Sequence, residues 1–257
     1  MRNIKVFLYK DNISYDLNKH ISKKYNVDSV EYVYINNEYI MNNKEGFFEK
    51  FRDCDLAFIV YDLDKDMDNL YIAKTLDFVS KVSYTADIFT TGIFLKENNY
   101  KKYNTSKFKK NINKLKKNLD SLLLLDKNDE FDNVESHIME YIIDILIDKK
   151  IKMGDIKFCL KDGGMSYLTK AHTRGRGKEK YIDVIDKVLK NKDIDEILDK
   201  TWSVIMKLRC DKTPYLLNNY IDYFKEKFDY NLNLIYYIYE DENMNDDVEM
   251  TIIVTEC

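Results

Sequence analysis

The stretch NLNLIYYIYEDENMNDDVEMTIIVTEC, residues 231–257, contains two β-rich runs on either side of an acidic segment. The runs Asn231–Tyr239 and Val248–Thr255 are rich in Ile, Tyr and Val, which are the residue types that favour strands. The segment Glu240–Asp247 between them predicts a polar loop of the hairpin type. We therefore expect the second half of the 257-residue chain to end in two long strands.

The residues before this stretch predict an α+β domain. Helices are expected at 155–162, 178–190 and 214–228, and strands at 165–173 and 202–209. Pro214 suits the first turn of the third of these helices. The apolar periodicity lapses around Asp148–Gly154, which predicts a boundary between a domain at 1–150 and a domain at 151–257.

The first half of the chain alternates between strand and helix patterns. Strands are expected at 4–9, 30–35, 56–61, 88–95 and 122–125, and helical patterns at 13–21, 47–51, 69–82, 106–119 and 134–147. Leu56–Tyr61 is apolar throughout, as in a strand that is buried on both faces. This order indicates βαβ units and a parallel sheet.

The overall composition excludes several classes of protein. Lys+Arg 41 against Asp+Glu 45 gives a net charge of −4, which is not that of a strongly basic nucleic-acid binder. No apolar run approaches 18 residues, so no membrane insertion is expected. The N-terminus shows no secretory signal, and the four cysteines are widely spaced. We expect a cytoplasmic protein with reduced thiols and no metal site.

Several segments resemble the bacterial tubulin homologue FtsZ. Residues 231–257 are similar to the strand, acidic loop and strand that close the globular part of that family, with Met250–Thr255 as the last strand. Further similar segments, some of them looser, are 154–185, 201–224, 30–38, 53–62 and 111–125. The resemblance implies an α/β, tubulin/FtsZ-like fold, with an N-terminal Rossmann-like parallel sheet domain and a C-terminal α+β domain.

The glycine loops with which that family binds GTP have no counterpart in this sequence. After the first expected strand, Leu8–Tyr15 contains no Gly where the family has a run of them. After the third strand, the family's G-G-G-T-G-T-G is replaced by DLDKDMD, which contains Asp62, Asp64, Asp66 and Asp68. Glycines let backbone N–H groups approach a phosphate, whereas β-carbons block that approach and carboxylates repel the phosphate. We expect at best weak binding of GTP, and no other cofactor.

The hydrolysis loop of the family, N-x-D-x-x-D, is also lost. Only Asp155 matches it, at the last Asp, while Lys149, Lys150 and Lys152 occupy the preceding segment. Lysines cannot polarise a water as the family's Asn and Asp would. We therefore expect no catalytic residue and no enzymatic activity.

The resemblance then implies a cytoskeletal or filament-associated protein that works by protein–protein association. Its expected partner is a second copy or an FtsZ/tubulin-type protein, as in cell division. Asp62, Asp64, Asp66 and Asp68 of one copy would face Lys149, Lys150 and Lys152 of the next. Direct ion pairs would then replace the nucleotide in the contact.

Three other interpretations are weighed against this one. The first is a divergent GTPase with another loop geometry, which the lack of glycines opposes. The second is a nucleic-acid or segregation adaptor that uses Lys101–Lys117, where eight lysines and no acid occur. A solvated helix with Ile112 facing inward explains that segment better. The third is a calcium loop at 62–73, which has Met67 and Ala73 where an EF-hand requires Gly and Glu.

Overall fold

The computed structural model describes residues 4–9, 30–35, 44–62, 81, 88–96, 112–113, 116–117, 119–126, 151–161, 165–175, 177–228 and 232–256. These belong to two compact units, Met1–Ile147 (unit 1) and Asp148–Cys257 (unit 2), and each is considered by itself. The helices predicted at 13–21 and 134–147, nearly all of that at 69–82 and most of that at 106–119 lie outside the described residues. No helix in the described ranges combines the length and the apolar character that crossing a membrane requires.

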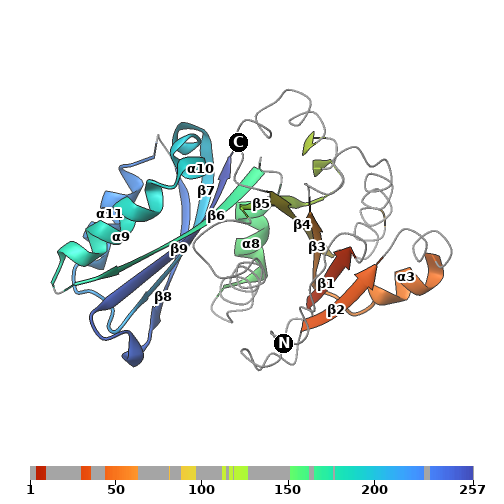
Figure 1. The fold of residues 1–257 in the computed structure, drawn as a ribbon, viewed down its shortest axis with the longest axis horizontal. Coiled ribbons are helices and arrows are strands. Elements are labelled where there is room, and N and C mark those ends of the chain that lie inside the picture. Colours follow the sequence, from red (N-terminus) through yellow and green to blue (C-terminus); the bar gives the residue numbers. More distant parts are fainter. Residues whose placement is uncertain are drawn as a thin grey trace. The chain divides into compact units, whose positions relative to one another are not determined.

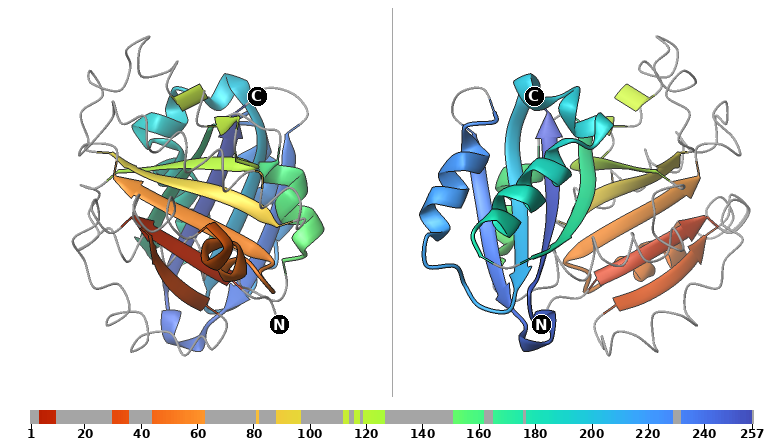
Figure 2. Two further views of the ribbon diagram at one scale, coloured as in Figure 1. Left: turned by 90° about the vertical axis from the view of Figure 1, so that its right-hand side faces the viewer. Right: turned by 60° about the vertical axis from the view of Figure 1, so that its left-hand side comes forward.

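Unit 1 contains a parallel sheet, as the alternating pattern predicts. Its strands are β1 (Ile4–Tyr9), β2 (Val30–Ile35), β3 (Leu56–Asp62), β4 (Phe89–Lys96) and β5 (Ser121–Asp126). They lie side by side in the order β2-β1-β3-β4-β5, and each adjacent pair is parallel (Figure 2). Leu56–Val60 of β3 is buried on both faces, because the strand occupies the middle of the sheet.

A short helix, α3 (Lys44–Lys50), packs an aromatic cluster onto this sheet. Phe47 lies on α3 and Phe51 just after it, and both rings contact Phe7 of β1, at centroid distances of 5.7 and 4.4 Å. All three side chains are buried. The helix expected from the phenylalanines at 47–51 is thus confirmed, although it begins and ends earlier.

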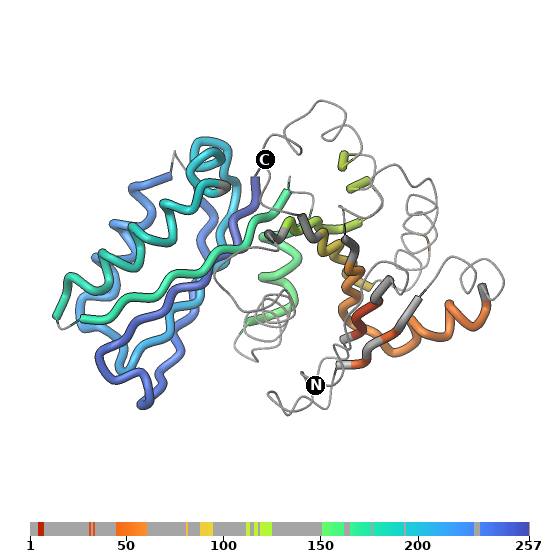
Figure 3. The backbone as a smooth tube through the Cα atoms, in the orientation of Figure 1, coloured from red at the N-terminus to blue at the C-terminus, as the bar shows by residue number. Residues whose placement is uncertain are grey.

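Unit 2 contains a mixed sheet of four strands. These are β6 (Met165–Arg174), β7 (Thr201–Cys210), β8 (Asn233–Glu240) and β9 (Asp247–Glu256), in the order β6-β9-β7-β8. The strand β9 runs antiparallel to both β6 and β7, whereas β7 and β8 are parallel. Figure 3 traces the path from β7 through a helix to β8.

The predicted hairpin between the last two strands is therefore wrong. Both strands exist, but β7 lies between β8 and β9. Burial explains the arrangement: Val248–Thr255 of β9 is buried except at Glu249, so this strand takes a central position, whereas every residue of β8 remains at least partly exposed. The loop between them crosses the end of β7, where the Asp241 N–H donates to the Cys210 carbonyl at 2.8 Å.

The helices of unit 2 lie on both faces of its sheet (Figure 1). They are α8 (Met153–Leu160), α9 (Glu179–Leu189), α10 (Lys192–Asp195) and α11 (Leu217–Lys225), with 3-10 turns at Leu198–Lys200 and Glu242–Met244. The core between the sheet and α9 and α11 includes Met206 and Met250. On the other face, Ser203 of β7 donates to the Cys159 carbonyl of α8 at 2.5 Å.

The position predicted for Pro214 is also wrong. The helix α11 begins at Leu217, so Pro214 lies in the turn before it and not in its first turn. Its carbonyl accepts a hydrogen bond from the Leu217 N–H at 3.1 Å, in a turn that leads into the helix.

Candidate functional site

The strand order of unit 1 defines where a ligand of this sheet would bind. In the order β2-β1-β3-β4-β5 the connections change direction between β1 and β3. Open parallel sheets bind ligands beyond the carboxyl ends of their strands, at such a switch point. Here β1 ends at Tyr9 and β3 ends at Asp62. The residues that follow these two positions would surround the ligand.

The segments that follow both strands contain no glycine. The first glycine of the chain is Gly46 and the second is Gly92, so the connections at 10–29 and 63–87 have none. Every residue there therefore has a β-carbon, which hinders the close approach of its backbone N–H to a diphosphate. This edge of the sheet thus lacks the residue type on which phosphate loops depend.

The predicted acidic surface begins at this edge. Asp62 is the last residue of β3, and its backbone pairs with Leu95 of β4. Asp64, Asp66 and Asp68 lie outside the described residues, so their arrangement remains a prediction.

The predicted basic residues come shortly before α8 in the sequence, and Asp155, the one match to the family's hydrolysis loop, lies in its first turn. Lys149 and Lys150 fall outside the described ranges, whereas Lys152 is exposed and Asp155 is partly buried. The Lys152 N–H donates to Asp155 Oδ2 at 3.3 Å, and the Asp155 N–H donates to the Lys152 carbonyl at 3.0 Å. Asp155 therefore caps the first turn of the helix.

A second donor holds the same carboxylate. The hydroxyl of Tyr237, on β8, donates to Asp155 Oδ2 at 3.1 Å. This contact fixes the first turn of α8 against the sheet. It joins residues 82 positions apart, and no local motif in the sequence points to it. The residue that matches the family's hydrolysis loop thus has a structural role that accounts for its presence.

One acidic side chain of the β8–β9 loop, Asp241, is paired with a side chain of the sheet. Arg209 Nε donates to Asp241 Oδ2 at 3.0 Å, and Lys170 Nζ lies 2.9 Å from Glu249 Oε2. Arg209 lies 4.0 Å from Glu249 as well, so these side chains form one network. The hydrogen bond from Arg209 and the one from the Asn243 N–H hold the pKa of Asp241 below its ordinary value. This network ties the acidic loop to the sheet.

The described cysteines do not have the environment of nucleophiles. Cys54, Cys159 and Cys210 are free thiols and are buried. Burial raises the pKa of each to about 11, so each is a neutral thiol at pH 7. Within the described ranges, no three His, Cys, Asp or Glu side chains are placed to hold a metal ion.

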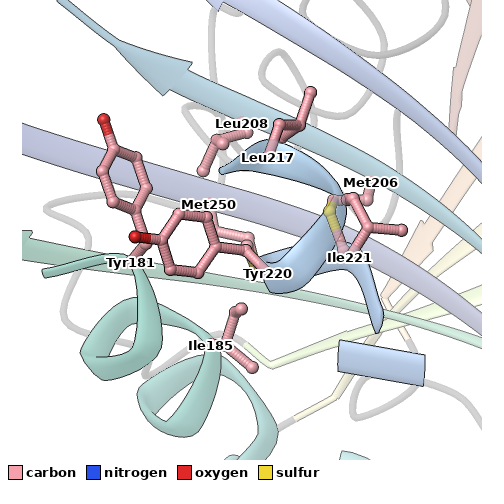
Figure 4. Close-up of a pocket in the computed structure, with 8 residues that line it drawn as sticks. All are labelled: Tyr181, Ile185, Met206, Leu208, Leu217, Tyr220, Ile221 and Met250. Carbon is pink, nitrogen blue, oxygen red and sulfur yellow. The ribbon is translucent and has the colours of Figure 1, made fainter. Parts of the chain in front are cut away.

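A pocket in unit 2 is too apolar for a nucleotide. It lies between α9, α11 and the sheet (Figure 4), and its lining consists of Tyr181, Ile185, Met206, Leu208, Leu217, Tyr220, Ile221 and Met250. The rings of Tyr181 and Tyr220 stack with centroids 4.9 Å apart. No side chain of this lining carries a charge that would bind a phosphate.

The basic segment Lys101–Lys117 lies largely outside the described residues. Ile112 is buried, while Asn113 and Lys117 are exposed. This burial agrees with the expectation that Ile112 faces inward.

Comparison with known proteins identifies the fold. No family model matches the sequence, and no curated protein matches it either. Among solved structures, the empty FtsZ dimer from M. jannaschii has a TM-score of 0.73 and 12% identity, over 99% of this chain and 88% of that one. CetZ from Methanosaeta thermophila has a TM-score of 0.67 and 12% identity, over 100% and 87%. CetZ2 from Haloferax volcanii, in a GTPγS-bound protofilament, has a TM-score of 0.63 and 8% identity, over 100% and 94%.

These similarities define the class of fold. The chain has the tubulin/FtsZ-like α/β fold that FtsZ and CetZ share, as the sequence resemblance implies. At such low identity the comparison establishes the fold alone.

Proposed function

We propose that this chain is an FtsZ/tubulin-like, filament-associated protein that acts by protein–protein association and does not hydrolyse GTP. The observation that carries the proposal is the absence of glycine from both segments that follow β1 and β3, at the switch point of the unit 1 sheet. The family fold is retained while the residues that would hold the phosphates are replaced.

The charges at this edge support the same conclusion. The segment Asp62–Asp68 has four Asp and one Lys, a formal charge of −3. A nucleoside triphosphate is itself strongly anionic, so its binding next to this segment would bring like charges together at short range. The side chain that matches the hydrolysis loop, Asp155, already accepts hydrogen bonds from Tyr237 and Lys152.

Self-association is supported by the solved proteins of this fold. One is a dimer of FtsZ, and another is a protofilament of CetZ2. In this chain we place the contact between Asp62, Asp64, Asp66 and Asp68 of one copy and Lys149, Lys150 and Lys152 of the next. Exposed ion pairs contribute about 0–1 kcal/mol each, and salt screens them. The association is therefore weak and falls as salt rises.

Sedimentation velocity tests this proposal. The wild type is compared with the double variant Lys150→Glu, Lys152→Glu at low and high salt, with and without GTP. We expect association at low salt that GTP does not change and that the double variant loses. The control is Lys190→Glu with Lys192→Glu, an exposed pair of the same spacing, which should associate as the wild type does.

Two results would contradict the proposal. GTP-dependent assembly would favour a divergent GTPase, and a protein that stays monomeric at every concentration would exclude self-association. Association that ignores both salt and the charge reversal would reject this contact.

A further inference from the structure

Two large aromatic side chains are exposed next to each other on unit 2. Phe158 of α8 is 56% exposed and Trp202 of β7 is 42% exposed. Their ring centroids lie 6.4 Å apart with an angle of 47° between the planes. Neighbouring exposed aromatics of this size are typical of binding surfaces, because burying them in a contact removes a large apolar area from water.

A β-bulge accounts for the exposure of Trp202. Thr201 pairs with Glu256 and Ser203 with Thr255, so Trp202 is the extra residue between two consecutive pairs. A bulge redirects a side chain that would otherwise follow the alternation of the strand. The side-chain amide of Asn233 donates to the Trp202 carbonyl at 3.3 Å and holds the strand here.

The helix α8, which carries Phe158, leaves the surface next to this pair open, and we call this surface the ledge. The outward positions of α8 are Gly154, Lys157 and Phe158, with Lys161 just beyond its end, while Ile156, Cys159 and Leu160 are buried. Helical side chains lean toward the N-terminus, so the residue one turn before Phe158 lies in the direction of its ring. That residue is Gly154, and no atom lies within 4 Å of the position that a β-carbon would take there. The ring of Phe158 is thus accessible from this side.

The charges around the ledge indicate what it binds. Lys152 and Lys161 are exposed, and Lys157 is partly exposed between them. Such a surface is complementary to an acidic segment that also carries apolar side chains. The segment Asp62–Asp68, DLDKDMD, has this composition, with Leu63 and Met67 among four aspartates. Methionine and leucine both pack well on aromatic rings, and the Met sulfur adds a favourable contact with them.

We propose that the Phe158–Trp202 pair is the docking surface for Leu63 and Met67 in the Asp62–Asp68 segment of a second copy of this chain. This inference rests on the proposed self-association and adds an apolar anchor to it. Ion pairs with Lys152 and its neighbours align the segment, and the aromatic pair supplies the contact that salt does not screen.

The test measures the dissociation constant of the full chain by sedimentation velocity, for the wild type and Phe158→Ala. The matched control is Phe48→Ala, since Phe48 of α3 is 47% exposed in unit 1. We expect Phe158→Ala to raise the dissociation constant about tenfold or more, as for a central aromatic anchor. Phe48→Ala should leave it unchanged. Thermal melts that match the wild type would show that both variants are folded.

A mixing experiment then identifies the occupant. The variant Leu63→Ser, Met67→Ser lacks the apolar side chains of the segment, and Phe158→Ala lacks part of the surface. Neither should associate alone as the wild type does, but their mixture holds one intact contact and should form dimers. Trp202, the single Trp of the chain, should change its fluorescence as these dimers form.

Each other outcome overturns the inference. If the wild type associates and Phe158→Ala associates equally well, the ledge is not part of the contact, and the proposed association stands without it. If the mixture fails to form dimers, the occupant is a different segment or a different molecule. A change in Trp202 fluorescence that does not depend on protein concentration would mean that the Asp62–Asp68 segment contacts the ledge of its own chain and not that of a second copy. A monomeric wild type would overturn both proposals.

Discussion

Unit 1 and unit 2 bury their strands in different ways. In unit 1 the described strands are parallel, and residues 56–60 of the central strand β3 are buried on both faces. In unit 2 the sheet is mixed, with β9 in a central position and β8 as a partly exposed outer strand. The first sheet is therefore built from parallel strands with continuous apolar runs, whereas the second combines a buried central strand with a partly exposed outer strand.

The comparison of the two units distinguishes the residues that maintain the fold from those that would bind a ligand or perform chemistry. In unit 1 the apolar strands are intact, while the segments beyond their carboxyl ends lack glycine. In unit 2 polar side chains such as Asp155, Arg209 and Asp241 bind to one another or to neighbouring strands. The residues that specify a fold are thus different from those that a ligand site requires, so the proposed loss of the nucleotide site is compatible with the retained fold.

The largest effect is expected in the cores of both units. Phe58→Ala in β3 and Phe224→Ala in α11 each remove a fully buried ring, so each should lower the free energy of unfolding by about 3–5 kcal/mol. Urea unfolding measured by circular dichroism checks both. The exposed Phe48 provides the control, and Phe48→Ala should cost less than about 0.5 kcal/mol. A loss below 1 kcal/mol at Phe224 would show that the core of unit 2 is not packed as described, since cavities of this kind cost about 3 kcal/mol or more.

A smaller effect should distinguish the polar contacts of the two units. Glu249→Gln in unit 2 removes the charge that Lys170 contacts, and both side chains are largely buried, at 16% and 13% exposed. We expect a loss of about 1–3 kcal/mol in urea unfolding. Glu31→Gln in unit 1 affects a pair with Lys5 in which Glu31 is 50% exposed, and should cost about 0–1 kcal/mol. Equal losses in the free energy of unfolding at Glu249 and Glu31 would mean that the two units do not differ in the strength of these ion pairs.

The next effect concerns the role of Asp155. Asp155→Ala removes the helix cap and the acceptor of Tyr237, so the free energy of unfolding should fall by about 1–2 kcal/mol. Tyr237→Phe removes only one of these hydrogen bonds and should cost less. Asp183→Ala, at an exposed position of α9, is the control. If Asp155→Ala left stability unchanged, the structural explanation of this residue would fail.

The smallest effect is a change in pH dependence. Because Arg209 lowers the pKa of Asp241 in the folded state, the stability that this ionised carboxylate contributes is complete above its unfolded pKa, near 3.8. That contribution is lost as the pH falls through the lower, folded-state pKa. In Asp241→Asn, the free energy of unfolding should therefore fall less steeply as the pH drops below about 4, which is near the ordinary pKa of an Asp, about 3.9. Acid unfolding followed by circular dichroism measures this. An unchanged acid profile would mean that the pair with Arg209 does not persist in solution.

Much of the fold could be predicted from the sequence, because local patterns specify it. The strands at 4–9 and 30–35 have the predicted bounds, and β3 extends one residue beyond the predicted run. Continuous apolar runs have one stable solution in a parallel sheet, which is burial on both faces. The predicted pairing of the last two strands is wrong because a polar loop between two strands does not reveal a third strand. Here β7 lies between β8 and β9.

The candidate site could be predicted only as a set of positions. The loss of the glycines is visible directly in the sequence, and the strand order gives it a location. The hydrogen bond from Tyr237 to Asp155 could not be predicted, since it joins an outer strand to a helix 82 residues earlier. The exposure of Trp202 could not be predicted either, because it follows from a bulge in the register of β7 against β9.

The central claim is that the fold has been kept while its nucleotide site has been lost. Isothermal titration calorimetry of GTP into the full chain, with and without magnesium, tests it most directly. The account predicts no saturable heat, because the segments that follow β1 and β3 contain no glycine and the sequence Asp62–Asp68 contains four aspartates. Saturable binding with a dissociation constant in the micromolar range would contradict it.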